Sequence, residues 1–244
     1  MSFSQNVPKV IQNLAFGTNV MQELAKESAA RIAADAIDNG HIVGLGSGTT
    51  VAHFIKILAD RCKSGLRIQA VSSSRHSTDL ARKGGIEIVD INSVPRIDIT
   101  VDGADEIDPK KRMIKGRGGA HVREKILASS SNEMVVIIDE TKMVANLGMG
   151  PLPIEILFYG SPATRQKIEN LGFAGKWRMN EDGTLFVSEN GNLILNISFD
   201  SPLSDPESEH AKLIQIPGVV DTGFFFNLAG NVIVGYENGT TKTW

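Results

Sequence analysis

Three short segments of the sequence combine glycines with polar or charged side chains, and each could hold an anionic ligand. The first, residues 44–50 (GLGSGTT), lies between an apolar stretch and a helical pattern. Glycines let the backbone approach a ligand closely, and the free N–H groups at a helix start favour an anion. Ser47, Thr49 and Thr50 add hydroxyl donors. The segment therefore predicts a phosphate or sugar contact, with a tight strand-to-helix turn as the alternative.

Two common nucleotide motifs do not fit this first segment. The dinucleotide fingerprint GxGxxG would need a glycine at position 49, which is threonine. The P-loop pattern GxxxxGK[ST] would need a lysine, and the segment has none. Neither a dinucleotide cofactor nor a P-loop nucleotide is predicted here.

The second segment, residues 101–108 (VDGADEID), is acidic and follows a predicted strand. Counting one residue just upstream, five carboxylates fall within eleven residues, namely Asp98, Asp102, Asp105, Glu106 and Asp108. Open α/β sheets form their sites at the carboxyl ends of strands, and crowded like charges raise carboxyl pKa values and suit proton transfer. A divalent-metal site and a solvated acidic turn are alternatives. The calcium-loop pattern DxDxDG is absent.

The third segment is basic and opens another helical pattern. Residues 115–120 (KGRGGA) precede HVREK, and seven lysines and arginines lie between positions 110 and 125. Lysine, arginine and glycines before a helix predict a second anion cradle. Glu124 falls in the opening turn of that helix, where the macrodipole favours its ionised form. A glutamate on a helix surface is usually solvated, so this pattern alone does not make Glu124 catalytic.

The remaining reactive side chains show no catalytic or metal-binding spacing. The five histidines (His41, His53, His76, His121 and His210) form neither HxH nor HExxH, and each is expected to be structural or exposed. The single cysteine, Cys62, cannot form an internal disulfide or a cysteine zinc site, and it is expected to be a small buried side chain.

The three segments must be positioned by strands and helices that alternate as far as residue 149. Helical patterns cover 21–36, 51–58, 77–82 and 122–128, and short apolar strands cover 41–43, 67–71, 86–91, 97–101 and 134–138. This alternation predicts an open, mostly parallel, Rossmann-like α/β sheet with helices on both faces. Residues 232–236 are expected to return to it as a final strand.

The pattern changes at the boundary sequence GPLP, residues 150–153. Strands are predicted over 153–158, 177–179, 193–199 and 219–226, with helices over 164–171 and 207–214. The order strand, helix, strand, strand, helix, strand is that of a ferredoxin-like α+β domain. We therefore expect an N-terminal extension (1–20), an α/β catalytic domain (21–149 with 227–244) and a smaller ferredoxin-like domain (150–226).

Composition excludes several classes of protein. Hydrophobic residues make up 41% of the 244 residues and charged residues 22%, which is typical of globular domains. A net charge of −3 gives no general basic surface for nucleic acid or an anionic membrane, and no apolar run is long enough to span a bilayer. The first 20 residues hold neither a secretory nor a transit pattern. With a single cysteine, a cytoplasmic location is expected.

The three segments in this order, with SSS at 72–74, resemble ribose-5-phosphate isomerase type A. Further similar stretches are 135–147, PLPIE at 151–155, NGNLILN at 190–196 and IPGVV at 216–220. The resemblance runs from about residue 21 to the carboxyl terminus. It implies interconversion of ribose 5-phosphate and ribulose 5-phosphate without a metal or organic cofactor, in a homodimer or homotetramer. The run 224–226 (FFF) is expected to supply some subunit contacts.

The resemblance also assigns roles by position. It implies that Glu124 is the general base, that Asp102 and Lys115 assist ring opening, and that Lys115 also stabilises the enediolate. The implied substrate contacts are Ser47, Gly48, Thr49, Thr50, Asp102, Gly103, Ala104, Asp105, Lys115, Gly116, Arg117, Gly118, Lys142 and Lys26, the two last on the phosphate. The role of Arg117 is left open, because this position varies in the family.

Other classes of function fit the sequence less well. A sugar-phosphate sensor of a transcription regulator shares this general fold but needs a DNA-binding module, for which about 20 residues before Met21 are too few. Amino-sugar-phosphate deaminases and coenzyme A transferases have a similar architecture, but the VDGADE and KGRGGA pair argues against them. A purely structural or interaction protein would not need three site loops.

Overall fold

The computed structural model describes the backbone of residues 9–244 and the side chains from residue 20 onward. Helix α1 spans Lys9–Asp35, so it begins well before the predicted start at Met21. The predicted extension 1–20 therefore belongs in part to α1, and its first eight residues lie outside the described part.

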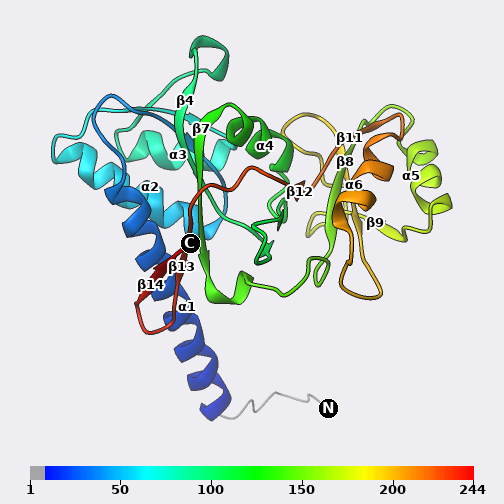
Figure 1. Cartoon of the computed structure of the whole chain (residues 1–244), viewed down its shortest axis with the longest axis horizontal. Helices are drawn as coiled ribbons and strands as arrows, with labels where there is room; N and C mark the ends of the chain where they lie inside the picture. Colours follow the sequence, from blue (N-terminus) through cyan, green and yellow to red (C-terminus); the bar gives the residue numbers. More distant parts are fainter. Residues whose placement is uncertain (1–8) are drawn as a thin grey trace.

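A seven-stranded sheet forms the larger half of the molecule (Figure 1). Its order is β14-β13-β7-β4-β1-β2-β3, and every neighbouring pair is parallel except β13 with β14. The strands are β1 (Ile42–Leu45), β2 (Gln69–Ser72), β3 (Glu87–Ile88), β4 (Ile97–Asp102), β7 (Ser131–Asp139), β13 (Val232–Gly235) and β14 (Thr241–Thr243). The predicted mostly parallel α/β sheet is confirmed.

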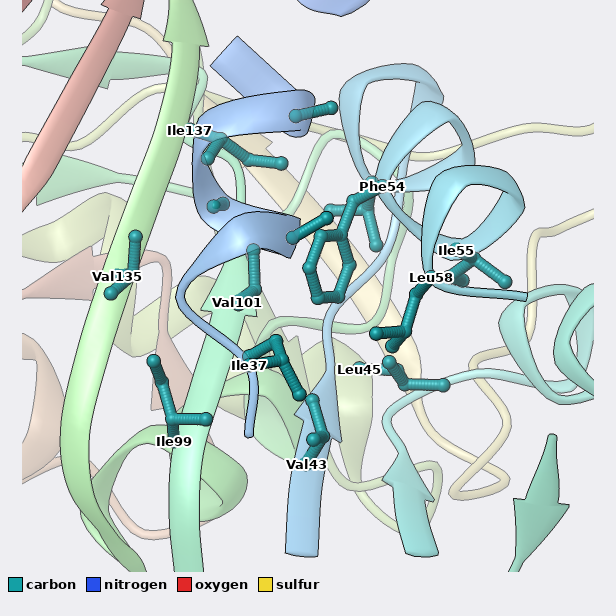
Figure 2. Packing of buried hydrophobic residues seen from close by; sticks show 14 of the residues in the cluster. Ile37, Val43, Leu45, Phe54, Ile55, Leu58, Ile99, Val101, Val135 and Ile137 are labelled. Atoms are coloured by element: carbon teal, nitrogen blue, oxygen red, sulfur yellow. The ribbon is translucent and has the colours of Figure 1, made fainter. Parts of the chain in front are cut away.

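Helices cover both faces of this sheet. Alternate residues of β7 point to opposite faces, so Val135 and Ile137 join one buried cluster while Met134 and Val136 join another. The first cluster packs α1 and α2 (Thr49–Lys63) against β1, β4 and β7, with Phe54 fully buried at its centre (Figure 2). Burying such a side chain contributes about 1.5–3 kcal/mol.

Helices α3 and α4 complete the larger half. Helix α3 spans Arg75–Lys83 and α4 spans His121–Ser129. Leu127 of α4 packs against β2 and β4 on the face opposite α1 and α2, and this contact fixes α4 above the sheet. The start of α4 therefore lies near the carboxyl ends of these strands.

The second half is the predicted ferredoxin-like unit. Its four strands, all antiparallel, are ordered β11-β8-β10-β9, and its helices are α5 and α6. The bounds are β8 (Leu152–Ile156), α5 (Ser161–Asn170), β9 (Gly175–Trp177), β10 (Leu193–Ile197), α6 (Pro206–Ile214) and β11 (Val219–Thr222). The exact domain limits stay a prediction.

A third, small sheet interrupts the predicted strand 219–226. Strand β12 (Phe224–Phe225) pairs with β6 (Met113–Ile114), which pairs with β5 (Glu106–Ile107). The break falls at Gly223, whose N–H donates to the Pro153 carbonyl at 2.7 Å. A Cβ at Gly223 would lie 2.3 Å from the Lys115 carbonyl oxygen, so a side chain could not fit.

The small sheet corrects another expectation. Phe224 and Phe225 are 1% and 0% exposed within one chain, so these two rings cannot supply the predicted subunit contacts. Assembly as a homodimer or homotetramer stays a prediction.

Several predicted strands have different limits. The predicted strand 86–91 is reduced to β3 and a 3₁₀ turn at Ile91–Ser93, and the strand predicted at 177–179 is β9, two residues earlier. The strands β5, β6 and β14 were not predicted, because two or three residues are too few to show a periodicity. In the region from residue 9 onward, no helix has both the length and the apolar character needed to cross a membrane.

Candidate active site

The three predicted segments meet at one cavity of about 310 Å³ beyond the carboxyl ends of β1 and β4. Its lining comprises Ser47, Gly48, Thr49, Thr50, Gly103, Ala104, Asp105, Lys115, Gly116, Arg117, Gly118, Glu124 and Lys142. Parallel strands bring their carboxyl ends to one edge, and this is why loops distant in sequence converge here. The predicted site residues thus line one cavity except for two, Asp102, which is buried behind Lys115, and Lys26.

Lys115 lies at the centre of a buried charge cluster. Its Nζ is 3.0 Å from Asp102 Oδ2 and 3.2 Å from Glu124 Oε2, and it donates to the Gly103 carbonyl at 2.6 Å. All three charged side chains are at most 4% exposed. Burial opposes the charge on Lys115, but the two carboxylates outweigh it and raise the pKa of the lysine. Lys115 is therefore a permanent cation at the cavity wall.

The second sheet holds the Lys115 backbone in place. The Lys115 N–H donates to the Gly223 carbonyl at 2.8 Å, and Gly223 in turn is bound to Pro153 of β8. The backbone of Lys115 is thus held by the segment around Gly223, and its side chain is held by Asp102 and Glu124 of the larger half.

Asp102 lies directly beneath the cavity at the end of β4. Its Oδ1 accepts from the Gly103 N–H at 2.7 Å and the Ser47 N–H at 3.2 Å. Gly46 makes room for it, because a Cβ there would lie 2.1 Å from Oδ1. Burial and the Glu124 charge raise the pKa of Asp102 to about 7, while Lys115 acts in the opposite direction. Near neutral pH this carboxyl can both accept and donate a proton.

Glu124 lies in the first turn of α4, and its side chain is buried instead of facing solvent. Its side chain is 4% exposed, and Oε1 accepts a hydrogen bond from the Ser47 hydroxyl. The two residues are 77 positions apart, and no sequence signal could have shown this contact. The pairing fixes the carboxylate while Oε2 faces Lys115.

The structure separates the five acidic residues of the second segment. Asp98 accepts from the Ile42 N–H, Asp108 pairs with Arg112, and Glu106 accepts from the N–H groups of 148–150. Of the five, only Asp105 lines the cavity, while Asp102 lies buried beneath it. Asp105 accepts from the Arg117 N–H at 2.8 Å and stays near the cavity opening.

The same cavity is lined by a helix N-terminus and a lysine. Gly48 precedes α2 with φ +96°, a conformation that favours glycine, and Thr49 and Thr50 begin the helix. Lys142 reaches the same cavity from a 3₁₀ turn at Glu140–Lys142. A helix N-terminus with hydroxyls and a lysine suits a phosphate group.

Lys26 is not among the lining residues. It lies on α1, where Nζ donates to Glu23 Oε1 at 2.7 Å, and Glu23 also contacts His53 Nε2 at 2.8 Å. The structure therefore places Lys26 in an ion-pair cluster on α1, and its role on the phosphate stays a prediction.

Within the described residues, no three His, Cys, Asp or Glu side chains are grouped so that they could hold an ion. The acidic residues that reach the cavity contact a lysine or backbone N–H groups instead.

Comparison with known proteins decides the family. The profile of "Ribose 5-phosphate isomerase A (phosphoriboisomerase A)" matches residues 69–239. The chain belongs to this family. Ribose-5-phosphate isomerase A of Protochlamydia amoebophila is 48% identical over 218 residues, covering 89% of this chain and 94% of the relative. That of Bacillus mycoides is 42% identical over 214 residues, covering 88% and 96%. The chain is thus an isomerase, like the other members of the ribose 5-phosphate isomerase A family.

Solved structures of the same family share the fold. Ribose 5-phosphate isomerase from Plasmodium falciparum has 35% identity and a TM-score of 0.85, covering 90% of this chain and 97% of its own. A D-ribose-5-phosphate isomerase in complex with phospho-erythronic acid has the same identity and TM-score, covering 90% and 96%.

Proposed function

We propose that this chain interconverts D-ribose 5-phosphate and D-ribulose 5-phosphate by moving a proton between C2 and C1 through a cis-enediolate. The observation that supports it best is the buried cluster of Glu124, Lys115 and Asp102 beside a cavity that is also lined by residues 48–50 and Lys142, which suit a phosphate. The curated relatives carry the corresponding name.

Glu124 is the base in this scheme. Its carboxylate removes the proton from C2 of the open-chain aldose and returns it to C1 on the same face, because a single group in one position serves both carbons. Within the enediolate the O2 hydroxyl proton passes to O1, so that C2 becomes the carbonyl carbon and C1 carries the hydroxyl. The Ser47 hydroxyl binds Oε1, and Lys115 Nζ lies 3.2 Å from Oε2, so the carboxylate is held in place at the cavity wall. A positioned base contributes about 10²–10⁴-fold to the rate.

Lys115 stabilises the charge that develops on the substrate oxygen. When Glu124 takes the proton it loses its negative charge, and the lysine is then free to interact with the enediolate. A preorganised cation in a site that excludes water is worth far more than one in bulk solvent. The buried position of Lys115 meets this requirement.

Asp102 serves ring opening. Ribose 5-phosphate is mostly a closed ring, so a proton must leave the C1 hydroxyl and another must reach the ring oxygen. A carboxyl with a pKa of about 7 can exchange protons with both groups. Asp105, at the opening, is placed to accept hydrogen bonds from sugar hydroxyls.

The phosphate fixes the position of the reacting carbons. It binds at residues 48–50 and Lys142, and this remote contact orients C1 and C2 at Glu124. Phospho-erythronic acid, which carries a carboxylate at one end and a phosphate at the other, binds one relative and is expected to bind here. The scheme uses neither a metal nor an organic cofactor.

Proton NMR of ribose 5-phosphate with the purified protein in D₂O containing EDTA tests the proposal. We expect ribulose 5-phosphate to form and deuterium to enter at the exchanging carbon. If the sugar phosphate binds without turnover, the chain is a sensor and the proposal fails. Release of ammonia from an amino-sugar phosphate would instead favour a deaminase.

A further inference from the structure

The turn that follows Lys115 is held by one guanidinium from the second sheet. Arg178 lies just after β9, and its Nη1 donates to the Gly116 carbonyl at 2.9 Å and the Arg117 carbonyl at 3.0 Å. Its Nη2 donates to Asn196 of β10 at 2.7 Å. One side chain therefore connects two consecutive carbonyls of the 116–118 turn to strand β10.

Arg178 itself is firmly anchored. Its N–H donates to the Ile194 carbonyl at 2.8 Å, and its own carbonyl accepts from the Phe186 N–H at 2.9 Å. Its guanidinium also lies over the Phe186 ring, 5.6 Å from the centroid. The same ring packs on Gly119, where a Cβ would lie 2.6 Å from it. Arg178 and Phe186 thus form a fixed support for the turn.

The direction of these two carbonyls decides where the next N–H groups point. In a trans peptide the C=O of one residue and the N–H of the following residue lie on opposite sides. The described backbone has no cis peptide, so the N–H of Arg117 must point away from Arg178. It does so and donates to Asp105 Oδ2 at 2.8 Å on the cavity side.

The same geometry orients the N–H of Gly118. Because the Arg117 carbonyl faces Arg178, this N–H points to the opposite side, and it has no hydrogen-bond acceptor among the described residues. Gly118 lines the cavity, and a Cβ on it would lie 3.6 Å from Ser47 Oγ, the hydroxyl bound to Glu124. An unused donor therefore lies beside the proposed base.

We propose that Arg178 is a positioning residue that holds the 116–118 turn so that the Gly118 N–H donates to the enediolate oxygen. This inference rests on the proposed function and adds a role for the second sheet. Without Arg178, the Arg117 carbonyl loses its donor, whereas the Gly116 carbonyl keeps the Gly119 N–H at 2.9 Å. The 117–118 peptide can then rotate. A rotated 117–118 peptide would turn a carbonyl oxygen toward the developing negative charge.

Kinetics of Arg178→Ala and Arg178→Lys test the inference. We expect kcat to fall about 10²-fold in Arg178→Ala, as for the loss of one oxyanion donor. KM is expected to change less than about threefold, because the variant leaves the proposed phosphate contacts untouched. Arg178→Lys keeps the charge but not the planar fork, so it is expected to recover little of kcat. Guanidinium ion is expected to restore part of kcat in Arg178→Ala and none in Arg178→Lys.

Arg165→Ala is the matched control. Arg165 also belongs to the second half and stacks on an aromatic ring, Trp177, but in the described structure its side chain donates only to Glu169 of its own helix. The kcat of Arg165→Ala is expected to match that of the wild type.

Binding gives a readout that does not depend on turnover. We expect Arg178→Ala to lower the affinity for phospho-erythronic acid at least tenfold more than the affinity for inorganic phosphate, because only the acid places a carboxylate near Gly118. A wild-type kcat in both variants would overturn the inference. So would an equal loss of affinity for both ligands without guanidinium rescue, which marks a purely structural role. An inactive wild-type protein would instead refute the proposed function, while the affinity ratio would still report on the turn.

Discussion

Replacing Lys115 by methionine is the sharpest test of the buried charge cluster. Methionine keeps most of the length of the side chain but removes the cation that contacts both Asp102 and Glu124. Two carboxylates then face each other in a site where neither is more than 4% exposed. Removing one partner of a buried ion pair costs about 3–5 kcal/mol, because the other charge is left uncompensated.

The size of the effect follows from the length of the chain. For a protein of this size each kcal/mol shifts the melting temperature by about 2–4 °C, so Lys115→Met is expected to melt about 10 °C lower at pH 8. Lys110→Met is the control, because Lys110 is exposed and lies in the same stretch of chain. It removes the same charge and is expected to melt within about 1–2 °C of the wild type, as for most surface changes.

The drop in the melting temperature of Lys115→Met should also depend on pH. The pKa of Asp102 is about 7 with Lys115 present and about 3.9 in an unfolded chain. A carboxyl whose folded pKa is raised loses stability as the pH rises from the unfolded value through the folded one. Without the lysine the Asp102 pKa rises further. The difference between variant and wild type should therefore be smallest near pH 5 and largest above pH 8.

Thermal unfolding followed by circular dichroism at pH 5 and pH 8 measures both quantities. A variant that melts with the wild type at pH 8 would refute the claim that Lys115 compensates two buried charges. A loss of equal size at both pH values would show that shape, not charge, is what Lys115 provides.

Three further predictions concern single residues of the site. Glu124→Gln is expected to lower kcat at least about 100-fold while phospho-erythronic acid still binds, and near-normal turnover would exclude Glu124 as the base. Gly46→Ala places a Cβ 2.1 Å from Asp102 Oδ1, so calorimetry should show a loss of about 1–3 kcal/mol together with a lower kcat; unchanged values for both would mean that the carboxylate moves without consequence. Lys142→Ala is expected to raise KM about tenfold with kcat nearly unchanged, whereas Lys110→Ala should leave KM alone, and equal KM values in steady-state assays would remove Lys142 from the phosphate site.

The sequence by itself predicted the fold class, and together with the family resemblance it predicted every residue that lines the cavity. Hydrophobic periodicity is a local property, so the alternating strands and helices and the ferredoxin-like order could be predicted without knowledge of the contacts. Loops after parallel strands meet at one edge, so the segments at 44–50 and 101–108 could be expected to converge. The glycines were informative because backbone conformation and close approach restrict residue type locally.

Tertiary structure decided which polar residues reach the site. Of five neighbouring carboxylates, only Asp105 lines the cavity, and only Asp102 lies buried beneath it against Lys115. The other three bind backbone N–H groups or an arginine away from the cavity. Lys26 is drawn into an ion pair on α1 instead. Such choices depend on strand register and on partners far away in the chain, and no local pattern contains them.

The burial of Glu124 was also decided only in three dimensions. The sequence places it on a helix start, where most glutamates face solvent, but the fold sets Ser47 and Lys115 against it. The predicted strand 219–226 is likewise interrupted at Gly223, whose carbonyl accepts a hydrogen bond from the Lys115 N–H. A buried charge is tolerated only where its partners have already been assembled, and assembling them requires the whole fold.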